Sequence, residues 1–396
     1  MSPPLEGVRV VEVAQYVAGP LAGSLLAELG AEVIKVEPPA GDAYRQVMPV
    51  ADGIGRYFVP LNRGKRSVVL DLKSGAGRFA LARLVATADI VLHNAPPARA
   101  AAFGLRWQDL HLTHPALVAG VVTSFGPHGP LAGQPSYDLV AQGRAGLLTS
   151  HASTGDRVPV RAGGIPMADL TAGHLLASGV LAGLVRARTT GEGQLVEVSL
   201  LGAALAVQIQ DLVWLEGEAS GPAAAATRDD LAARADEIAD GLAMNPYYRC
   251  YEAADGFLAV ACLNRAQRAA FLGLFGHDDP TIDAPDVVPD DPAVLERKQR
   301  LTAAIEAEIA SAPVEEWLAR LGAVGVPAGP VLARETVHAD AQVRANGLIQ
   351  DVAQPGLGQL TMLGAIFRLD GADPDPIRPA PALGADTDAI LREVGA

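Results

Sequence analysis

The alternation of strand-like and helix-like runs over the first third of the chain constrains the fold more than any other feature. Short runs rich in Val, Ile and Leu, typical of buried parallel strands, are expected at 8–13, 30–37, 67–72, 89–92 and 117–124. Helical spacing of apolar residues lies between some of them, at 21–29 and 77–86. Because parallel strands joined by helices form right-handed crossovers, this order predicts an α/β protein with a parallel, Rossmann-like sheet.

In a sheet of this kind the ligand crevice lies beyond the carboxyl ends of the strands. The residues expected there are candidate site positions: Gln15, Glu37, Lys73, His93-Asn94 and Phe125-Gly126. The first strand-to-helix turn, Ala18-Gly19-Pro20, lacks the glycine pattern of dinucleotide-binding proteins. A nicotinamide-dependent enzyme is therefore not predicted.

Charge excludes one class of partner and suggests another. The 396 residues carry a formal net charge of -14, which argues against nucleic acid as the main partner. Basic residues nevertheless gather between 56 and 73: Arg56, Arg63, Lys65, Arg66 and Lys73. This stretch predicts a surface for the phosphate groups of a small ligand, with an ordinary solvated face as the alternative.

The chain is predicted to be soluble and cytoplasmic, with no membrane partner. Cys250 and Cys262 are the only cysteines, and their spacing fits neither a metal site nor a disulfide framework. The N-terminus has no basic leader or apolar core of a signal peptide. The most apolar run, 170–185, contains Thr, His and Ser and is expected to be too short to span a bilayer.

Changes in composition and in the pattern of apolar residues along the chain predict two domains. Residues 1–216 are expected to form a large α/β domain, and 217–244, rich in Ala, Asp and Glu, a linker. Residues 245–326 are expected to form a smaller α+β domain with strands at 248–253 and 256–261 and helices at 265–275, 292–310 and 314–321. Residues 327–396 are expected to be a return linker and a C-terminal segment that completes the large domain. Further helices are expected at 200–216, 339–349 and 387–394.

Asp169 is the most informative single acid. It lies between two glycine-containing turns and directly before an apolar run, so a helix is expected to start at or near Leu170. One interpretation is an N-cap that accepts the free N–H groups of the first turn; the other is a poised nucleophile or base. Asp138, which opens an apolar run at 139–148, is also a candidate cap.

Familiar catalytic motifs are missing: Gly-x-Ser-x-Gly, the P-loop, His-Glu-x-x-His and clusters of His and Cys. Pattern alone therefore predicts a soluble α/β enzyme that binds a phosphorylated ligand, with carboxylate chemistry as an option.

An ordered set of short motifs adds a resemblance over almost the full length. The motifs are Leu29-Gly30-Ala31-Glu32-Val33-Ile34-Lys35-Val36-Glu37-Pro38, Asn62-Arg63-Gly64-Lys65-Arg66-Ser67, Tyr137-Asp138, Val198-Ser199-Leu200-Leu201 and Gly325-Val326-Pro327-Ala328-Gly329-Pro330-Val331. In these the chain resembles the class III (CaiB/BaiF type) coenzyme A transferases, the family that also contains the 2-methylacyl-CoA racemases.

The resemblance implies that Asp169 is the nucleophile of a CoA transfer from an acyl-CoA thioester to a carboxylic acid, through aspartyl anhydride and aspartyl-CoA thioester intermediates. CoA is then a substrate, with no separate cofactor and no metal. The expected CoA and substrate contacts are Gln15, Leu72, Lys73, Asn94 and Tyr137. Where the family usually has Asn-Phe-Arg-Pro-Gly, this chain has Asn94-Ala95-Pro96-Pro97-Ala98, which leaves Arg99 and Arg106 as candidate phosphate partners.

The resemblance also implies an interlocked homodimer, with the linkers at 217–241 and near 327–334 as crossing segments. Two other functions stay open. The racemase branch uses a His and a Glu beside the shared Asp169, and these positions correspond to Tyr137 and fall near Asn264, so transfer is favoured. A CoA-binding homologue without catalysis is the third hypothesis.

Overall fold

The computed structural model describes residues 2–150, 162–216, 227–233, 235–236, 245–286, 289, 291–372 and 376–396. They fall into two compact units, treated separately here. The first is made of the described residues of Met1–Leu148, Arg161–Pro222 and His338–Ala396, and the second of those of Thr149–Val160 and Ala223–Val337. Most of the predicted linker at 217–244 lies outside the described residues.

A parallel sheet of six strands organises the first unit. Its spatial order is β5 (Arg66–Val69), β2 (Glu32–Glu37), β1 (Arg9–Val13), β6 (Ile90–His93), β7 (Val118–Thr123) and β8 (Leu195–Ser199). Every neighbouring pair is parallel. This confirms the predicted α/β fold, and the strand order is that of a doubly wound sheet. Its topological switch point lies between β1 and β6, where such folds bind ligands.

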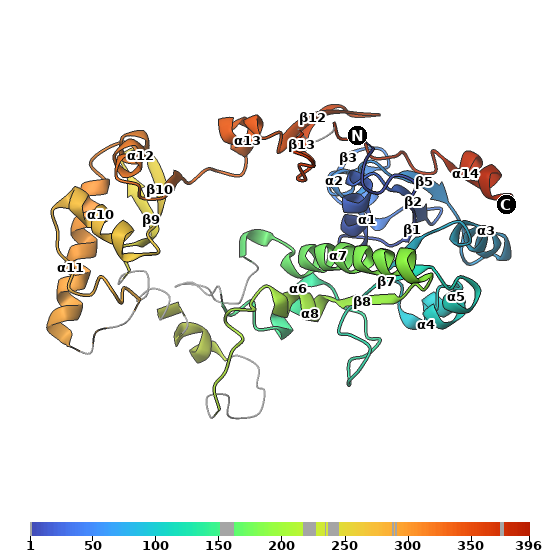
Figure 1. Cartoon of the computed structure of the whole chain (residues 1–396), viewed down its shortest axis with the longest axis horizontal. Coiled ribbons are helices and arrows are strands. Elements are labelled where there is room, and N and C mark those ends of the chain that lie inside the picture. The colour runs from blue at the N-terminus through green and yellow to red at the C-terminus, as the bar shows by residue number, and fades with distance from the viewer. Residues whose placement is uncertain are drawn as a thin grey trace. The chain divides into compact units, whose positions relative to one another are not determined.

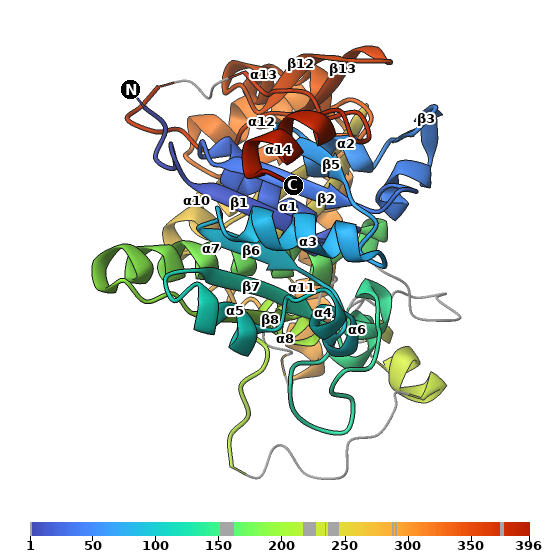
Figure 2. The same cartoon turned by 90° about the vertical axis from the view of Figure 1, so that its right-hand side faces the viewer.

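Helices cover both faces of the sheet (Figure 2). One face carries α1 (Ala18–Glu28), α6 (Asp138–Arg144), α7 (Met167–Thr190) and α8 (Leu200–Ala206). The other carries α3 (Gly75–Val85), α4 (Pro97–Ala102), α5 (Trp107–Thr113) and α14 (Thr387–Val394). Valine, isoleucine and leucine side chains of the strands point alternately into these two cores, which explains the nearly continuous apolar runs in the sequence.

The long helix α7 lies along the sheet and packs against α1 (Figure 1). The two approach closely because Gly173 has no side chain: a Cβ there would lie 2.9 Å from the carbonyl oxygen of Ala18. By length and composition α7 could cross a membrane, so the expectation that its apolar run is too short is wrong. Ala172, Leu176 and Val180 are nevertheless fully buried in the core, and α7 is the central helix of one layer.

Shorter elements complete the first unit: η1 (Ala43–Gln46), β3 (Pro49–Ala51), β4 (Ile54–Gly55), α2 (Phe58–Asn62), η2 (Ala162–Gly164), α13 (Ala341–Ala345) and the hairpin of β12 (Ile349–Gln354) and β13 (Gly358–Leu363). The short helix η3 (Val337–Ala339) begins at the last residue of the second unit. The helices expected at 200–216 and 339–349 are both shorter than predicted. For the first, the Gln208 side chain donates to the Ala204 carbonyl and so replaces the next backbone bond of the helix.

The second unit is an antiparallel sheet of β11 (Ala328–Pro330), β10 (Gly256–Ala261) and β9 (Tyr248–Ala253), packed with α10 (Arg265–Phe275), α11 (Pro292–Ile309) and α12 (Val314–Ala323). Strands and helices fall where they were expected. Trp317, Tyr247, Tyr251 and Phe271 form its core. Cys250 is exposed and Cys262 buried, and both are free thiols.

Candidate active site

Asp169 lies inside the first turn of α7. The helix begins at Met167, after Pro166, and therefore starts before the predicted residue. The cap is a different carboxylate: Asp138 Oδ1 accepts from the backbone N–H of Ala168 at 2.9 Å and of Asp169 at 3.3 Å. The interpretation of Asp169 as an N-cap is therefore wrong, and Asp138 caps α7 instead of its own helix.

Asp138 is itself held firmly. Its side chain is buried, with 5% exposed, and its Oδ2 accepts from the Gln142 side chain at 2.7 Å, one turn further along α6. The same Gln142 amide donates to the Ile165 carbonyl at 3.3 Å, just before α7 begins. These bonds join the start of α6 to the start of α7 and place the backbone of Asp169, whose side chain is half-buried, next to the Asp138 carboxylate.

At the switch point, Gln15 and Asn94 are joined by two reciprocal bonds. Asn94 Oδ1 accepts from the Gln15 N–H at 3.2 Å, and Asn94 Nδ2 donates to the Gln15 carbonyl at 2.8 Å. The next residue, Tyr16, has φ of 71°, in the left-handed region. A bulky residue in this conformation costs about 1–3 kcal/mol, so it persists only where its surroundings hold it.

Tyrosine rings connect this turn to the start of α6. Tyr16 packs edge-on against Tyr137 and against Tyr44, each with centroids 5.6 Å apart, and Tyr44 lies 6.1 Å from Tyr57. A hydrogen bond with Tyr137, then burial, raises the pKa of the Tyr16 hydroxyl. Tyr137 is 63% exposed. Contacts therefore bring Gln15, Asn94, Tyr137 and Asp169 to one region.

Leu72 and Lys73 lie apart from this group. They follow β5, the edge strand two places from β1 in the sheet, at the same carboxyl edge. Arg78 of α3 donates to the carbonyls of Leu72 at 3.2 Å and Lys73 at 2.7 Å and so fixes their turn. Leu72 packs against the core of that face, while the Lys73 side chain is exposed. A ligand that reaches both groups must extend along the edge of the sheet.

The predicted basic surface at 56–73 is largely wrong, because three of its five cations are held in ion pairs within the protein, and two of these are buried. Arg63 is buried and paired with Glu28. Arg66 is paired with Glu32 and Glu393. Lys65 is fully buried. Arg56 and Lys73 are the two members that stay exposed.

Next to the turn that follows β1 lies a charged cluster that the sequence did not predict: Glu12, Lys35, Asp42 and Lys65, whose side chains are all fully buried. Lys35 Nζ lies 3.0 Å from Glu12 Oε1 and 2.8 Å from Asp42 Oδ2. Lys65 Nζ donates to Glu12 Oε2 at 2.7 Å. Burial alone lowers the pKa of Lys35, but the charges of Glu12 and Asp42 raise it overall. For Lys65, burial and the nearby charge of Lys35 outweigh the attraction of Glu12 and Asp42 and lower its pKa to about 8.

Two other strand-end candidates are structural in this fold. Glu37 accepts from both Arg45 Nε and Nη2 at 2.7 Å and from the Ser67 hydroxyl at 2.7 Å. Although burial raises the pKa of Glu37, the hydrogen bond from Arg45 and the charges of Lys35 and Arg45 lower it overall. After β7, the Gly126 N–H donates to the Thr123 hydroxyl in a turn with φ of 89° at Gly126. Neither position contacts the Gln15–Asn94 pair through a hydrogen bond in the described residues.

His93 is the third. It ends β6 with only 4% of its surface exposed, and its Nδ1 is buried without a hydrogen-bond partner in the described residues. Burial lowers the pKa of His93 to about 4, against the effect of a hydrogen bond to the backbone of Leu105. His93 is therefore neutral at physiological pH.

Of the two candidate phosphate partners, Arg106 is already occupied. It lies outside the protein core and makes two hydrogen bonds, of 2.8 and 2.6 Å, to Asp109. Arg99 is exposed on α4, five residues after Asn94.

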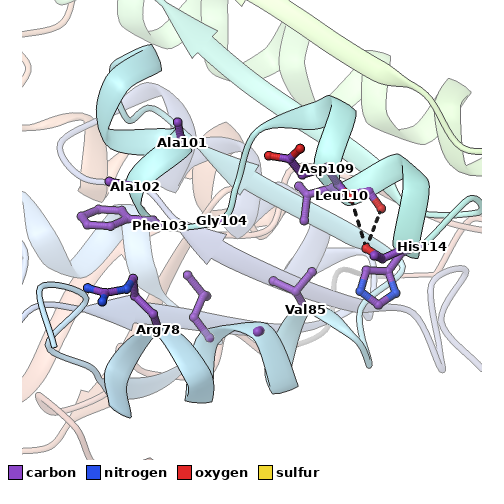
Figure 3. Close-up of a pocket in the computed structure, with 12 residues that line it drawn as sticks. Arg78, Val85, Ala101, Ala102, Phe103, Gly104, Asp109, Leu110 and His114 are labelled. Atoms are coloured by element: carbon purple, nitrogen blue, oxygen red, sulfur yellow. Dashed lines mark hydrogen bonds between the residues drawn. The ribbon is translucent and has the colours of Figure 1, made fainter. Parts of the chain in front are cut away.

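A cavity of about 430 Å³ lies between α3, α4 and α5 (Figure 3). Arg78 lies at its border, and its walls are mostly apolar, including Val85, Ala102, Phe103 and Leu110. Gln15, Asn94, Tyr137 and Asp169 do not line it. Within the described part of the chain, no group of three or more His, Cys, Asp or Glu side chains is arranged to hold a metal ion.

Comparison with known proteins defines the family. The model of CoA-transferase family III matches residues 5–387. The chain is 34% identical to a succinate–glutarate CoA-transferase of Agrobacterium fabrum over 413 aligned positions, covering 99% of this chain and 96% of the relative. It is 29% identical to an acetyl-CoA:oxalate CoA-transferase of Acetobacter aceti, covering 99% and 96%. The solved structure of a CaiB/BaiF family protein from Brucella suis matches with a TM-score of 0.78 at 30% identity, covering all of both chains.

The fold of this chain is thus that of a CaiB/BaiF family protein over its full length. The chain belongs to CoA-transferase family III and is a CoA-transferase.

Proposed function

We propose that this enzyme moves CoA from an acyl-CoA to a carboxylic acid, with the side chain of Asp169 as the covalent carrier. The observation that supports this most directly is that two neighbouring carboxylates, Asp138 and Asp169, have different roles. Asp138 is buried and caps α7, so a separate acid, Asp169, lies in the first turn at the site without serving as the cap. A carboxylate near a helix N-terminus is stabilised in its ionised, nucleophilic form.

The proposed sequence has four displacements, and each exchanges one anion for another. The Asp169 carboxylate attacks the thioester carbonyl, the C–S bond breaks, and CoA thiolate leaves a mixed anhydride. The thiolate then attacks the Asp169 carbonyl carbon and releases the donor acid as carboxylate. The acceptor carboxylate attacks this aspartyl-CoA thioester and expels the thiolate, which finally attacks the acceptor carbonyl and frees Asp169. An anhydride retains the activation of a thioester, so no ATP is needed.

The residues grouped around Asp169 have roles in binding. Gln15, Asn94 and Tyr137 are proposed to contact the acyl-CoA near the reacting carbonyl, and Leu72 and Lys73 to contact CoA further along the sheet edge. The exposed ring of Tyr137 and its neighbours Tyr16 and Tyr44 offer an aromatic surface for the body of the acid. Donor and acceptor pairs to test first are those in the relatives' names: succinyl-CoA with glutarate, and acetyl-CoA with oxalate.

Racemase chemistry is less well supported by the residues present. It needs a base opposite Asp169, and Tyr137 occupies the corresponding position. Asn264, near the other corresponding position, is engaged in a capping box with Gln267 at the start of α10. We also propose that the enzyme acts as an interlocked homodimer in the cytoplasm; sedimentation analysis and fractionation of cells test these two points.

A trapping experiment tests the carrier role. The enzyme is incubated with each acyl-CoA and hydroxylamine, digested, and examined by mass spectrometry for a hydroxamate. We expect the modification at Asp169 alone, and loss of transfer in Asp169→Ala while Asp138→Asn mainly loses stability. Wild-type transfer rates in Asp169→Ala are the result that refutes the proposal.

A further inference from the structure

The turn that follows β1 is held by charged groups that the transfer chemistry does not use. Tyr16 has a left-handed backbone, and it is one of three such non-glycine residues in the described part of the chain. On one side the Asn94 side chain fixes the Gln15 backbone through its two bonds. A single side chain that binds both the N–H and the carbonyl of one residue sets its position but leaves the residues on either side free to rotate.

The buried pair of Lys35 and Asp42 holds those neighbours. Lys35 Nζ donates to the Ala14 carbonyl at 2.9 Å, and Asp42 Oδ1 accepts from the Tyr16 N–H at 3.4 Å. Lys35 and Asp42 themselves form an ion pair of 2.8 Å. Gln15 is therefore flanked on both sides by backbone atoms that one ion pair fixes.

Stability alone does not explain why these charges are buried. A buried ion pair is often no more stabilising than apolar residues of similar size, because desolvation offsets most of the attraction. Lys35 and Asp42 are fully buried, and Lys35 shares Glu12 with a second buried lysine, Lys65. Unlike apolar side chains, these groups can bind backbone N–H and carbonyl groups in one orientation, which is what a fixed turn requires.

The turn is also connected mechanically to the reacting carboxylate. The Tyr16 ring contacts the Tyr137 ring, and the next residue, Asp138, caps the helix that carries Asp169. Directly after the turn, α1 begins at Ala18, whose carbonyl lies against α7 at Gly173. A shift of the turn would therefore move both the residues next to the site and the packing of α7.

We infer that the Lys35–Asp42 ion pair is a positioning device, which holds the strained Ala14–Tyr16 turn so that Gln15 and the Tyr16 ring stay aligned with Asp169 during CoA transfer. This inference rests on the proposed function of Asp169. It assigns Lys35 and Asp42 no contact with substrate. Their effect acts through the turn, and misplacement of reacting groups by about 1 Å lowers rates roughly 100-fold.

The test compares two buried ion pairs. Asp42→Asn removes the negative charge beneath the turn with little change in shape. Glu28→Gln does the same to the buried Glu28–Arg63 pair near the far end of α1. The rate of Asp169 modification is measured in a single turnover with succinyl-CoA and acetyl-CoA as probes, alongside thermal unfolding. We expect Asp42→Asn to lose roughly 10- to 100-fold in rate and Glu28→Gln to keep the wild-type rate at a similar loss of melting temperature.

If Asp42→Asn modifies Asp169 at the wild-type rate, the inference is overturned. If Asp169 is not modified in the wild type and Asp169→Ala still transfers CoA, the proposed function is overturned instead. Tyr16→Gly gives an independent arm, because glycine adopts the left-handed conformation without strain. In that background Asp42→Asn is expected to lower the melting temperature less than it does in wild type, even if the single variant folds poorly. If the shifts in melting temperature caused by Tyr16→Gly and Asp42→Asn are simply additive, the inference that the Lys35–Asp42 pair holds this turn is contradicted.

Discussion

The buried histidine at the end of β6 predicts how the first unit responds to acid. In the unfolded chain a histidine has a pKa near 6.5, whereas burial lowers the pKa of His93 to about 4 in the folded protein. Below pH 6.5 the unfolded chain therefore binds a proton that the folded state excludes, so stability falls as the pH drops from 6.5 to 4 and this loss ends near pH 4.

The size of this loss follows from the two values. Each unit of difference corresponds to about 1.4 kcal/mol, so the full loss is about 3 kcal/mol and the part between pH 7 and pH 5 about 2 kcal/mol. His93→Phe keeps an aromatic ring of similar size but cannot bind a proton. The variant loses the bond to the backbone of Leu105 at every pH, so its stability is offset by a constant, and only the slope with pH reports the titration.

Hydrogen exchange of the β6 and β7 amides measures the unfolding free energy of the first unit without interference from the second. Wild type is expected to lose about 2 kcal/mol more than His93→Phe between pH 7 and pH 5. His128→Gln, at an exposed turn, is the matched control and should keep the wild-type slope. Parallel curves for wild type and His93→Phe would refute the reasoning, because they would mean that His93 is charged inside the folded protein.

Two further predictions concern ligand binding and packing. Arg99→Ala is expected to raise the KM for acyl-CoA roughly tenfold through loss of a charged hydrogen bond. Arg106→Ala is expected to raise the KM much less, because the Arg106 guanidinium is already paired with Asp109. Equal KM values for the two variants in steady-state kinetics would contradict this. Gly193→Ala is expected to destabilise the first unit by about 3 kcal/mol in urea unfolding, because its Cβ would lie 1.8 Å from the Leu117 carbonyl, whereas Gly75→Ala, with open space, should unfold no more easily than wild type.

The sheet could be predicted from sequence because its strands are buried on both faces. Such strands are continuous apolar runs, as at Val10-Val11 and Ile90-Val91, and glycine or proline punctuates the helices between them. The short helices α4 and α5 were not predicted, since six or seven residues carry little periodicity. The helix that ends at Ala206 was predicted to be longer, because Ile209 and Val213 continue its apolar spacing. Both side chains are exposed, and apolar spacing alone does not show whether another element packs against them.

The site was harder, because its contacts join distant parts of the chain. Asp138 and Asp169 are 31 residues apart, and Gln15 and Asn94 are 79 apart. Each pair is ordinary in sequence, and local rules made both aspartates candidate caps. Once one carboxylate caps the helix, the other is released from that role, and only three-dimensional pairing decides which is which.

The buried charges show why sequence pattern fails here and what the failure means. Glu12 and Lys35 lie within strands, where a charged residue ordinarily indicates a solvent-facing position. In this protein both side chains are fully buried, and the cluster they form ends at the backbone of the Ala14–Tyr16 turn. Charged side chains at buried strand positions depart from the usual pattern of apolar residues inside and polar residues outside, and their burial costs desolvation free energy. Such departures are expected at functional sites. In this chain the buried charges reach the turn that follows β1, which borders the topological switch point and carries the predicted site residue Gln15.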